Sequence, residues 1–167
     1  SVIVQKMVNS EKAGVMFTIN PNTNNMDEIL IEAGFGLGEY VVLGRINPDL
    51  YILDKKTLKL KVKNIPNKKL KLIRDANTGE NVEKKIPENE QKFQVLTEYE
   101  IDTLGHLAIA IENHYKKPQD IEFAVENDKV YIVQSRPVTT IKEKSKDSLL
   151  KGKILVEGLG ASPGIGI

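Results

Sequence analysis

The sequence predicts an α+β fold with a mainly antiparallel sheet and flanking helices. Short apolar, β-branched runs separated by polar turns predict strands through the first 75 residues. Residues 58–63 alternate leucine or valine with lysine, which is typical of a half-exposed antiparallel strand. A well-capped helix begins at Thr97, and a hairpin follows it. The length of 167 residues suits one domain, or one domain with a tail.

Composition excludes several classes of protein. The absence of cysteine rules out a disulfide scaffold, a cysteine zinc finger and thiol catalysis. Because 24 basic residues nearly balance 23 acidic ones, the net charge of +1 gives no case for nucleic acid or an anionic membrane as a partner. No apolar run approaches the ~18 residues of a membrane span. We therefore expect a soluble, cytoplasmic protein.

Five segments in the first half carry strand-like patterns. Residues 41–43 fit either a short strand or a helical turn. The other four are expected strands or groups of strands: a buried strand at 2–8, strands at 14–19 and 28–33, and several short strands within 50–75.

The segment from Lys55 to Arg74 contains eight lysines and no acidic residue. The alternation with apolar residues predicts a solvated lysine face. No aromatic residue interleaves the lysines, so nucleic-acid binding is not favoured. A non-catalytic binding module that uses these strands is the alternative.

The helix and the hairpin have clear local signals. Thr97 and Glu100 form a capping-box pattern, apolar residues follow at helical spacing, and Pro118 ends the segment. Strands are expected at 121–126 and 130–134. His106 and His114 lie on the helix without a supporting ligand pattern, so we interpret them as structural or surface residues.

Two glycine-rich motifs fail as catalytic signatures. Residues 160–164 fit G-x-S-x-G, but Pro163 lacks the backbone N–H that an oxyanion hole needs. Residues 34–39 place Glu39 where a dinucleotide-binding turn requires its third glycine. No phosphate-binding P-loop is present. The 34–39 segment is therefore a turn that is either structural or placed beside a ligand.

The hairpin carries the candidate site. Glu122, Gln134 and Arg136 make little sense in a core, and together they suit a divalent cation that bridges phosphates. A three-residue turn at 127–129 would pair Glu122 with Gln134 and place every apolar residue on one face. A two-residue turn without a bulge would set Glu122 opposite Val133 and contradict a shared metal. We predict the three-residue turn.

Several motifs occur together in an order that resembles the phosphoenolpyruvate synthase family, to which pyruvate phosphate dikinase and rifampin phosphotransferase are related. They are the segments 5–8, 14–18, 20–21, 32–33, 36–39, 41–42, Gly44, 48–49, 120–123, 134–137 and 160–164. The resemblance implies that residues 1–140 are the later part of an ATP-grasp nucleotide-binding domain, its C-terminal subdomain. The many lysines and few apolar residues predict a linker at 141–153. The resemblance implies the truncated start of a phosphohistidine domain at 154–167.

The resemblance also implies roles for single residues. Glu32 and Glu39 are further candidates near the nucleotide, with a structural part in the glycine-rich turn as the alternative. Gln5, Met7 and Val8 would line the adenine pocket. Glu122 and Gln134 would contact Mg²⁺ and the phosphates. Arg136 would stabilise charge as the catalytic residue, with support from Asp120.

The implied reaction transfers a pyrophosphoryl group from ATP to a histidine and then a phosphoryl group to pyruvate. The products are phosphoenolpyruvate, AMP and phosphate. ATP, pyruvate and the phosphohistidine domain would be the partners, and Mg²⁺ the metal. We expect this chain to be a fragment that does not catalyse the reaction alone. A related phosphotransferase with another acceptor, such as the rifampin enzyme, is the alternative.

Overall fold

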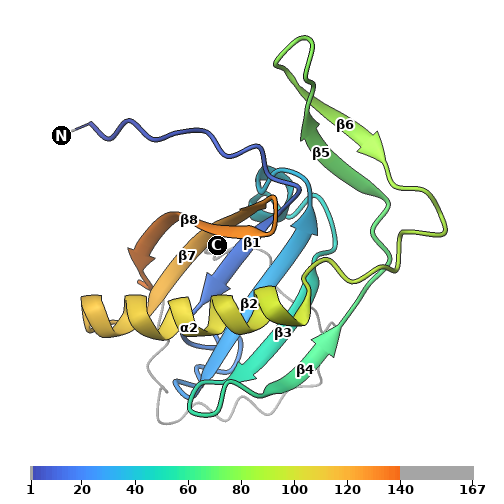
Figure 1. The fold of residues 1–167 in the computed structure, drawn as a ribbon. Coiled ribbons are helices and arrows are strands. Elements are labelled where there is room, and N and C mark those ends of the chain that lie inside the picture. Colours follow the sequence, from blue (N-terminus) through green and yellow to red (C-terminus); the bar gives the residue numbers. More distant parts are fainter. Residues whose placement is uncertain (1, 140–167) are drawn as a thin grey trace, which may run out of the picture.

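The computed structural model describes residues 2–139 (Figure 1). The expected linker at 141–153, the expected domain start at 154–167 and the G-x-S-x-G motif lie outside these residues. Within residues 2–139, neither helix has the length and apolar character needed to cross a lipid bilayer.

The main body is a six-stranded sheet with a long helix across one face (Figure 1). Each pair of neighbouring strands is antiparallel, which confirms the predicted α+β class with a mainly antiparallel sheet. The spatial order is β4-β3-β2-β1-β7-β8. The elements are β1 Lys12–Phe17, β2 Glu28–Phe35, β3 Asp49–Asp54, β4 Leu60–Asn64, β7 Gln119–Glu126, β8 Lys129–Pro137 and the helix α2 Glu98–Tyr115.

A second sheet consists of the hairpin β5–β6, which projects away from the main sheet (Figure 1). Its strands are β5 Leu70–Arg74 and β6 Asn81–Lys85, and the sequence pattern did not predict β6. The short helix α1 Glu39–Val42 precedes β3 and decides the open alternative at residues 41–43 in favour of a helical turn.

The core lies between α2 and the sheet. Side chains alternate between the two faces of a strand, so every second residue of each central strand faces the helix. The capping box is confirmed, because Glu100 N donates to Thr97 Oγ1 at 3.2 Å and Thr97 N donates to Glu100 Oε2 at 2.7 Å. The buried cluster is Met16, Ile29, Ile31, Ala33, Tyr51, Leu53, Val95, Leu96, Ile101, Leu104, Ala108, Ile121, Phe123 and Val125.

The predicted strand at residues 2–8 is wrong. The segment is extended chain without sheet pairing, and Val2, Ile3 and Val4 are 86–95% exposed. A strand needs a partner for its backbone groups. Both edges of β1 are occupied, by β2 and β7, and no described residue pairs with this segment.

The predicted lysine face is only partly correct. Lys61 and Lys63 are exposed on β4, and they pair with Glu28 and Glu98. Lys68, in contrast, is 1% exposed.

Lys68 belongs to a buried polar network. Its Nζ donates to Asp49 Oδ1 at 2.5 Å and to Pro66 O at 3.1 Å. The other Asp49 oxygen accepts bonds from Tyr51 Oη at 2.9 Å and Val95 N at 2.7 Å. The network joins β3, the start of the β5–β6 region and the segment before α2. The alternation of apolar and lysine residues could not predict this network, because Lys68 lies before β5 and its partner Asp49 lies on β3.

Candidate functional site

The face of the sheet opposite α2 carries the polar residues of the candidate site. Met16, Ile31 and Ile121 face the helix, so their neighbours along the strands point the other way. The strand register then places side chains in rows across this face. Val15 pairs with Glu122 of β7, and Glu122 pairs with Gln134 of β8.

The predicted pairing of Glu122 with Gln134 is confirmed, but the predicted three-residue turn is wrong. Glu126 pairs with Lys129 across a two-residue turn at Asn127 and Asp128. Both turn residues have positive φ, 51° and 59°, which is the type I′ geometry whose twist matches that of the strands. Asn and Asp tolerate this conformation better than other non-glycine residues.

A β-bulge restores the register that the two-residue turn would otherwise lose. Phe123 pairs with Ile132 and Glu122 with Gln134, so Val133 is the extra residue on β8. The amide Nε2 of Gln134 lies 3.5 Å from Glu122 Oε1. Because a bulge shifts the alternation by one residue, it puts the carboxylate and the amide on the same face.

The two-residue turn and the bulge decide which side chains of β8 face the core. The alternation of apolar residues predicts Tyr131 and Val133 on the inward face with Phe123, but they are 38% and 39% exposed. Val130 and Ile132 pack against the core instead. The expectation that every apolar residue shares one face is therefore wrong.

The next row of the same face holds Arg136 and Asp120. These residues pair across β7 and β8, and Arg136 Nε and Nη2 lie 2.8 and 2.7 Å from Asp120 Oδ2. The Asp120 side chain is 14% exposed and that of Arg136 is 66% exposed. The carboxylate thus fixes the guanidinium near the end of β8, while most of the guanidinium stays accessible.

Glu32 of β2 lies in the row of Glu122, since Val15 pairs with both residues. Burial raises the pKa of the Glu32 carboxyl. Among residues 2–139, no side chain forms a hydrogen bond or ion pair with the Glu32 carboxyl that would offset its burial. The row therefore presents acidic side chains from β2 and β7 and an amide from β8.

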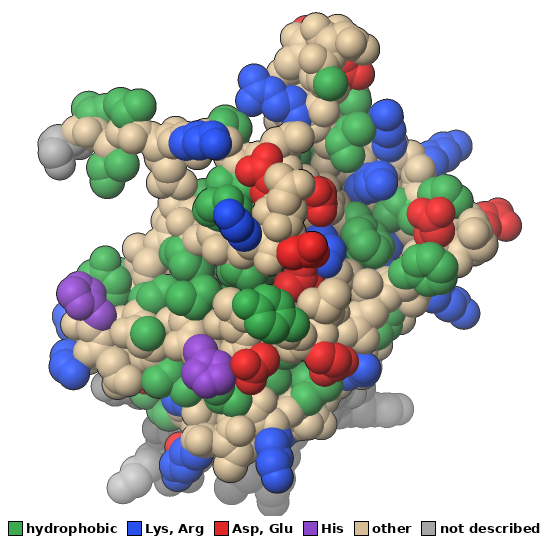
Figure 2. Space-filling view, in the orientation of Figure 1, with side chains coloured by type: hydrophobic (Ala, Val, Ile, Leu, Met, Phe, Trp, Pro, Cys, Tyr) green, Lys and Arg blue, Asp and Glu red, His purple; other side chains and the backbone are tan. Residues whose placement is uncertain are grey.

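The structure does not bring the remaining candidates to these rows. Gln5, Met7 and Val8 lie in the extended N-terminal segment, which leads away from the sheet, and Met7 is 70% exposed (Figure 1). Glu39 is exposed at the first turn of α1. His106 and His114 are exposed on α2, in agreement with their interpretation as surface residues. Figure 2 shows both histidine side chains on the outer side of that helix.

The glycine-rich turn has a structural role, which the sequence had left open. Gly36 has φ +83°, and a Cβ at this position would lie 2.1 Å from Leu72 O. Leu37 N donates to that same carbonyl at 2.8 Å, and Gly36 N donates to Glu11 O at 2.7 Å. Tyr40 Oη adds a bond of 2.8 Å to Glu83 of β6. The turn thus joins the projecting hairpin to the main sheet.

A family model described as "Pyruvate phosphate dikinase, AMP/ATP-binding domain" matches residues 1–153. The chain belongs to this family. The phosphoenolpyruvate synthase of Pyrococcus furiosus is 49% identical over 178 residues, a match that covers 99% of this chain and 22% of that protein. The probable phosphoenolpyruvate synthases of Pyrococcus horikoshii and Methanocaldococcus jannaschii are 50% and 46% identical, with 99% of this chain covered in each case.

These matches confirm the resemblance that the motifs predict. The chain spans 21% of the Pyrococcus horikoshii protein and 14% of the Methanocaldococcus jannaschii protein. It therefore corresponds to a small part of the curated relatives it matches. The relatives' names describe those proteins as phosphoenolpyruvate synthases, and the family description names a domain that binds AMP or ATP.

Proposed function

We propose that this chain is the later part of the ATP-grasp nucleotide-binding domain of a phosphoenolpyruvate synthase and binds Mg-ATP at the sheet face opposite α2. The observation that carries the proposal is the pairing of Glu122 with Gln134, one row from the Arg136–Asp120 ion pair. Family membership and the names of the relatives supply the nucleotide and the reaction class.

The residues present fit a magnesium ion. Mg²⁺ prefers oxygen ligands and is usually held by one or two carboxylates together with substrate phosphates and water. Among residues 2–139, no three His, Asp or Glu side chains gather as a ready-made metal cluster. Glu122 and Gln134 would be the protein ligands. The Gln134 amide, whose Nε2 faces Glu122, would rotate so that its oxygen faces the ion. When bound, the ion would offset charge on the phosphate oxygens.

The chain's own residues then have distinct tasks. Arg136 offers a cation fixed by Asp120, which can stabilise charge that develops on a transferring phosphate group. Glu32 extends the acidic row toward β2, and a bound cation would relieve the cost of its burial. Gln5, Met7 and Val8 would line the adenine pocket once the N-terminal segment packs over the nucleotide.

In the whole enzyme, we propose transfer of the β,γ-pyrophosphoryl group of ATP to a histidine of a phosphohistidine domain with release of AMP. Water then removes the outer phosphate, and the remaining phosphoryl group passes to pyruvate. The histidine carries the transferred group covalently, so the nucleotide site on this chain contributes positioning and electrostatic stabilisation. The chain alone should bind nucleotide weakly and should not complete the reaction.

Paramagnetic broadening in NMR spectra can test the metal ligands on this chain. Mn²⁺ with a non-hydrolysable ATP analogue should broaden the Gln134 side-chain amide and the β7–β8 backbone amides. E122Q should weaken this binding about tenfold or more, because a hydrogen bond or contact to a charged group contributes about 1.5–3 kcal/mol. E80Q, an exposed charge-matched change in the turn of the projecting hairpin, should leave the binding unchanged. Equal broadening in native and E122Q chains would contradict the assignment.

The catalytic consequence needs a whole enzyme that contains this sequence. There, Glu122→Ala should nearly abolish Mg-ATP-dependent phosphorylation of the histidine. Labelling with ATP radioactive at the β-phosphate would measure it, since that phosphate stays on the histidine after pyrophosphoryl transfer and release of phosphate. Near-native labelling of the variant would exclude Glu122 as a metal ligand.

A further inference from the structure

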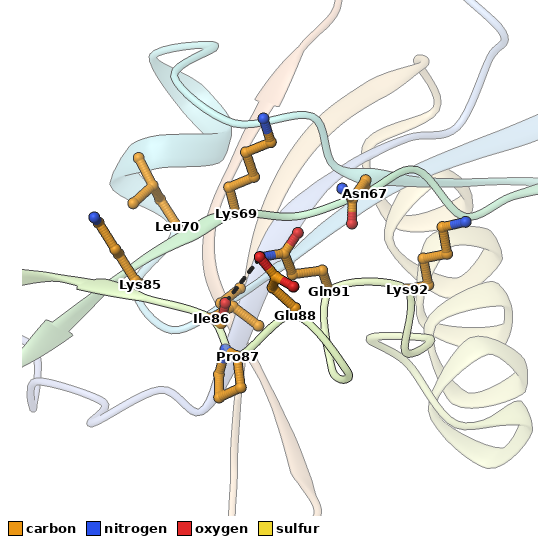
Figure 3. A pocket seen from close by; sticks show the side chains of 9 residues that line it. All are labelled: Asn67, Lys69, Leu70, Lys85, Ile86, Pro87, Glu88, Gln91 and Lys92. Atoms are coloured by element: carbon orange, nitrogen blue, oxygen red, sulfur yellow. Dashed lines mark hydrogen bonds between the residues drawn. The ribbon is translucent and has the colours of Figure 1, made fainter.

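A hollow of about 760 Å³ lies at the base of the β5–β6 hairpin, outside the six-stranded sheet (Figure 3). The start of β5, the end of β6 and the loop that follows β6 form its walls. Ile86 N donates to Lys69 O and Lys68 N donates to Gln91 O, both at 2.9 Å. Gln91 Nε2 also donates to Ile86 O at 3.0 Å. These bonds fix the walls, so the hollow is already formed in the folded chain.

The charge of the hollow is unbalanced. Lys69, Lys85 and Lys92 line it with exposed side chains, and none of them forms an ion pair with any of residues 2–139. Among the residues that line the hollow, Glu88 supplies the only negative charge. This differs from β4, where Lys61 is held by a carboxylate.

Three apolar residues also line the hollow. They are Leu70, Pro87 and Ile86, of which Ile86 is 4% exposed. In Figure 3 the three lysine side chains extend from different parts of the rim, with Gln91 and Glu88 between them. Their flexible stems allow them to turn toward a bound group, and lysines bind phosphate or carboxylate as point charges.

We propose that this hollow binds a small multivalent anion that carries phosphate or carboxylate groups on an apolar body. The volume falls in the range of small-molecule sites, which combine apolar walls with a few polar groups. The lysines would neutralise the anion, while its apolar part would cover Leu70 and Pro87, which are more exposed than Ile86. The proposal is independent of nucleotide binding, because none of the residues that line the hollow belongs to the main sheet.

NMR titration of the 167-residue chain tests this proposal with inorganic phosphate, phenyl phosphate and citrate. Each probe should shift backbone amides of residues 67–70 and 85–92, and added salt should weaken the binding because the lysines are exposed. Phenyl phosphate should bind more tightly than inorganic phosphate. Citrate tighter than phenyl phosphate would assign carboxylate ligands, and the reverse order would assign phosphate ligands. Both orders support the site.

A charge-matched pair of variants separates the site from general attraction of anions. K69Q/K85Q/K92Q should weaken binding about tenfold or more. K59Q/K117Q/K129Q removes the same charge from exposed lysines on other elements and should bind as the native chain does. Equal weakening by both variants, shifts spread over the whole surface, or no shifts at millimolar probe would overturn the proposal. Phenyl phosphate binding no tighter than phosphate would overturn the apolar contact.

Discussion

The hairpins β5–β6 and β7–β8 are similar in local form but are held in place by different means. β7–β8 lies within the main sheet, and its inward side chains, such as Phe123, pack under α2. β5–β6 stands outside that sheet, and a two-stranded hairpin is marginal by itself. Its position depends on the Leu72 carbonyl at the glycine-rich turn, on Tyr40, and on buried Lys68 at its base. A hairpin outside the main sheet is therefore held by specific polar contacts together with the burial of Leu72.

The largest effect is expected from removing the buried cation below β5–β6. Lys68→Met leaves the buried Asp49 carboxylate without its cation and with only the hydrogen bonds from Tyr51 and Val95, which should lower the free energy of unfolding by about 3–5 kcal/mol. Urea denaturation measures this loss. Lys59→Met, an exposed lysine without an ion pair to any described residue, should change stability by less than about 0.5 kcal/mol. Similar losses in the two variants would show that the buried pair does not anchor the hairpin.

The second effect concerns the glycine-rich turn. Gly36→Ala introduces a Cβ against the Leu72 carbonyl at a positive φ, so the turn or β5 must move, at a cost of about 1–3 kcal/mol. Hydrogen exchange of the Leu37 amide, which donates to Leu72, should accelerate. Gly38→Ala is the matched control, since its φ is −66° and, among residues 2–139, its new Cβ would meet only the Ala13 Cβ, at 3.3 Å. If the hydrogen exchange of the Leu37 amide is unchanged in Gly36→Ala, the glycine-rich turn does not hold the β5–β6 hairpin in position.

The third prediction compares how two carboxyl groups of β2 change the stability of the fold with pH. Burial raises the pKa of Glu32, so the native state holds its proton more tightly than the unfolded state does. Stability is then lost as the pH rises from the ordinary value of 4.5 through the raised one. Glu32→Gln should therefore be more stable than the native chain at pH 7, and the difference should vanish well below pH 4.5.

Glu28 should behave in the opposite way. Its hydrogen bond with Lys61 lowers the pKa of the carboxyl, so this group stabilises the fold above its ordinary pKa and ceases to do so in acid. Glu28→Gln should therefore lose stability at pH 7. Thermal unfolding as a function of pH measures both variants. If Glu32→Gln also loses stability at pH 7, then Glu32 serves the fold and is a poor candidate for a ligand-facing group.

The two regions also differ in how well the sequence predicts them. The polar pattern of Glu122, Gln134 and Arg136 predicts the correct pairing in β7–β8, because a carboxylate and a guanidinium are excluded from a core. The same pattern predicts the wrong turn length, because a two-residue turn with a bulge and a three-residue turn both pair Glu122 with Gln134. Lys68 could not be predicted as buried, since its partner Asp49 is 19 residues away along the chain. The N-terminal strand was wrong because apolar character does not specify a pairing partner.

The smallest effects are expected in the two turns. Asp128 has φ 59°, and a non-glycine residue pays about 1–2 kcal/mol for this conformation, while glycine loses about 0.5–1 kcal/mol more backbone entropy on folding. Asp128→Gly should therefore stabilise the chain by about 0.5 kcal/mol. Gly79 of the β5–β6 turn has φ +72°, and the one described atom that a Cβ there would approach is Arg74 Nη2, at 3.8 Å. Gly79→Ala should instead lower the free energy of unfolding by about 0.5–1 kcal/mol, because of backbone strain and without a steric clash. Urea denaturation of both variants would test the pair, and a loss in Asp128→Gly would mean that the Asp128 side chain stabilises the β7–β8 turn by more than the strain of its backbone.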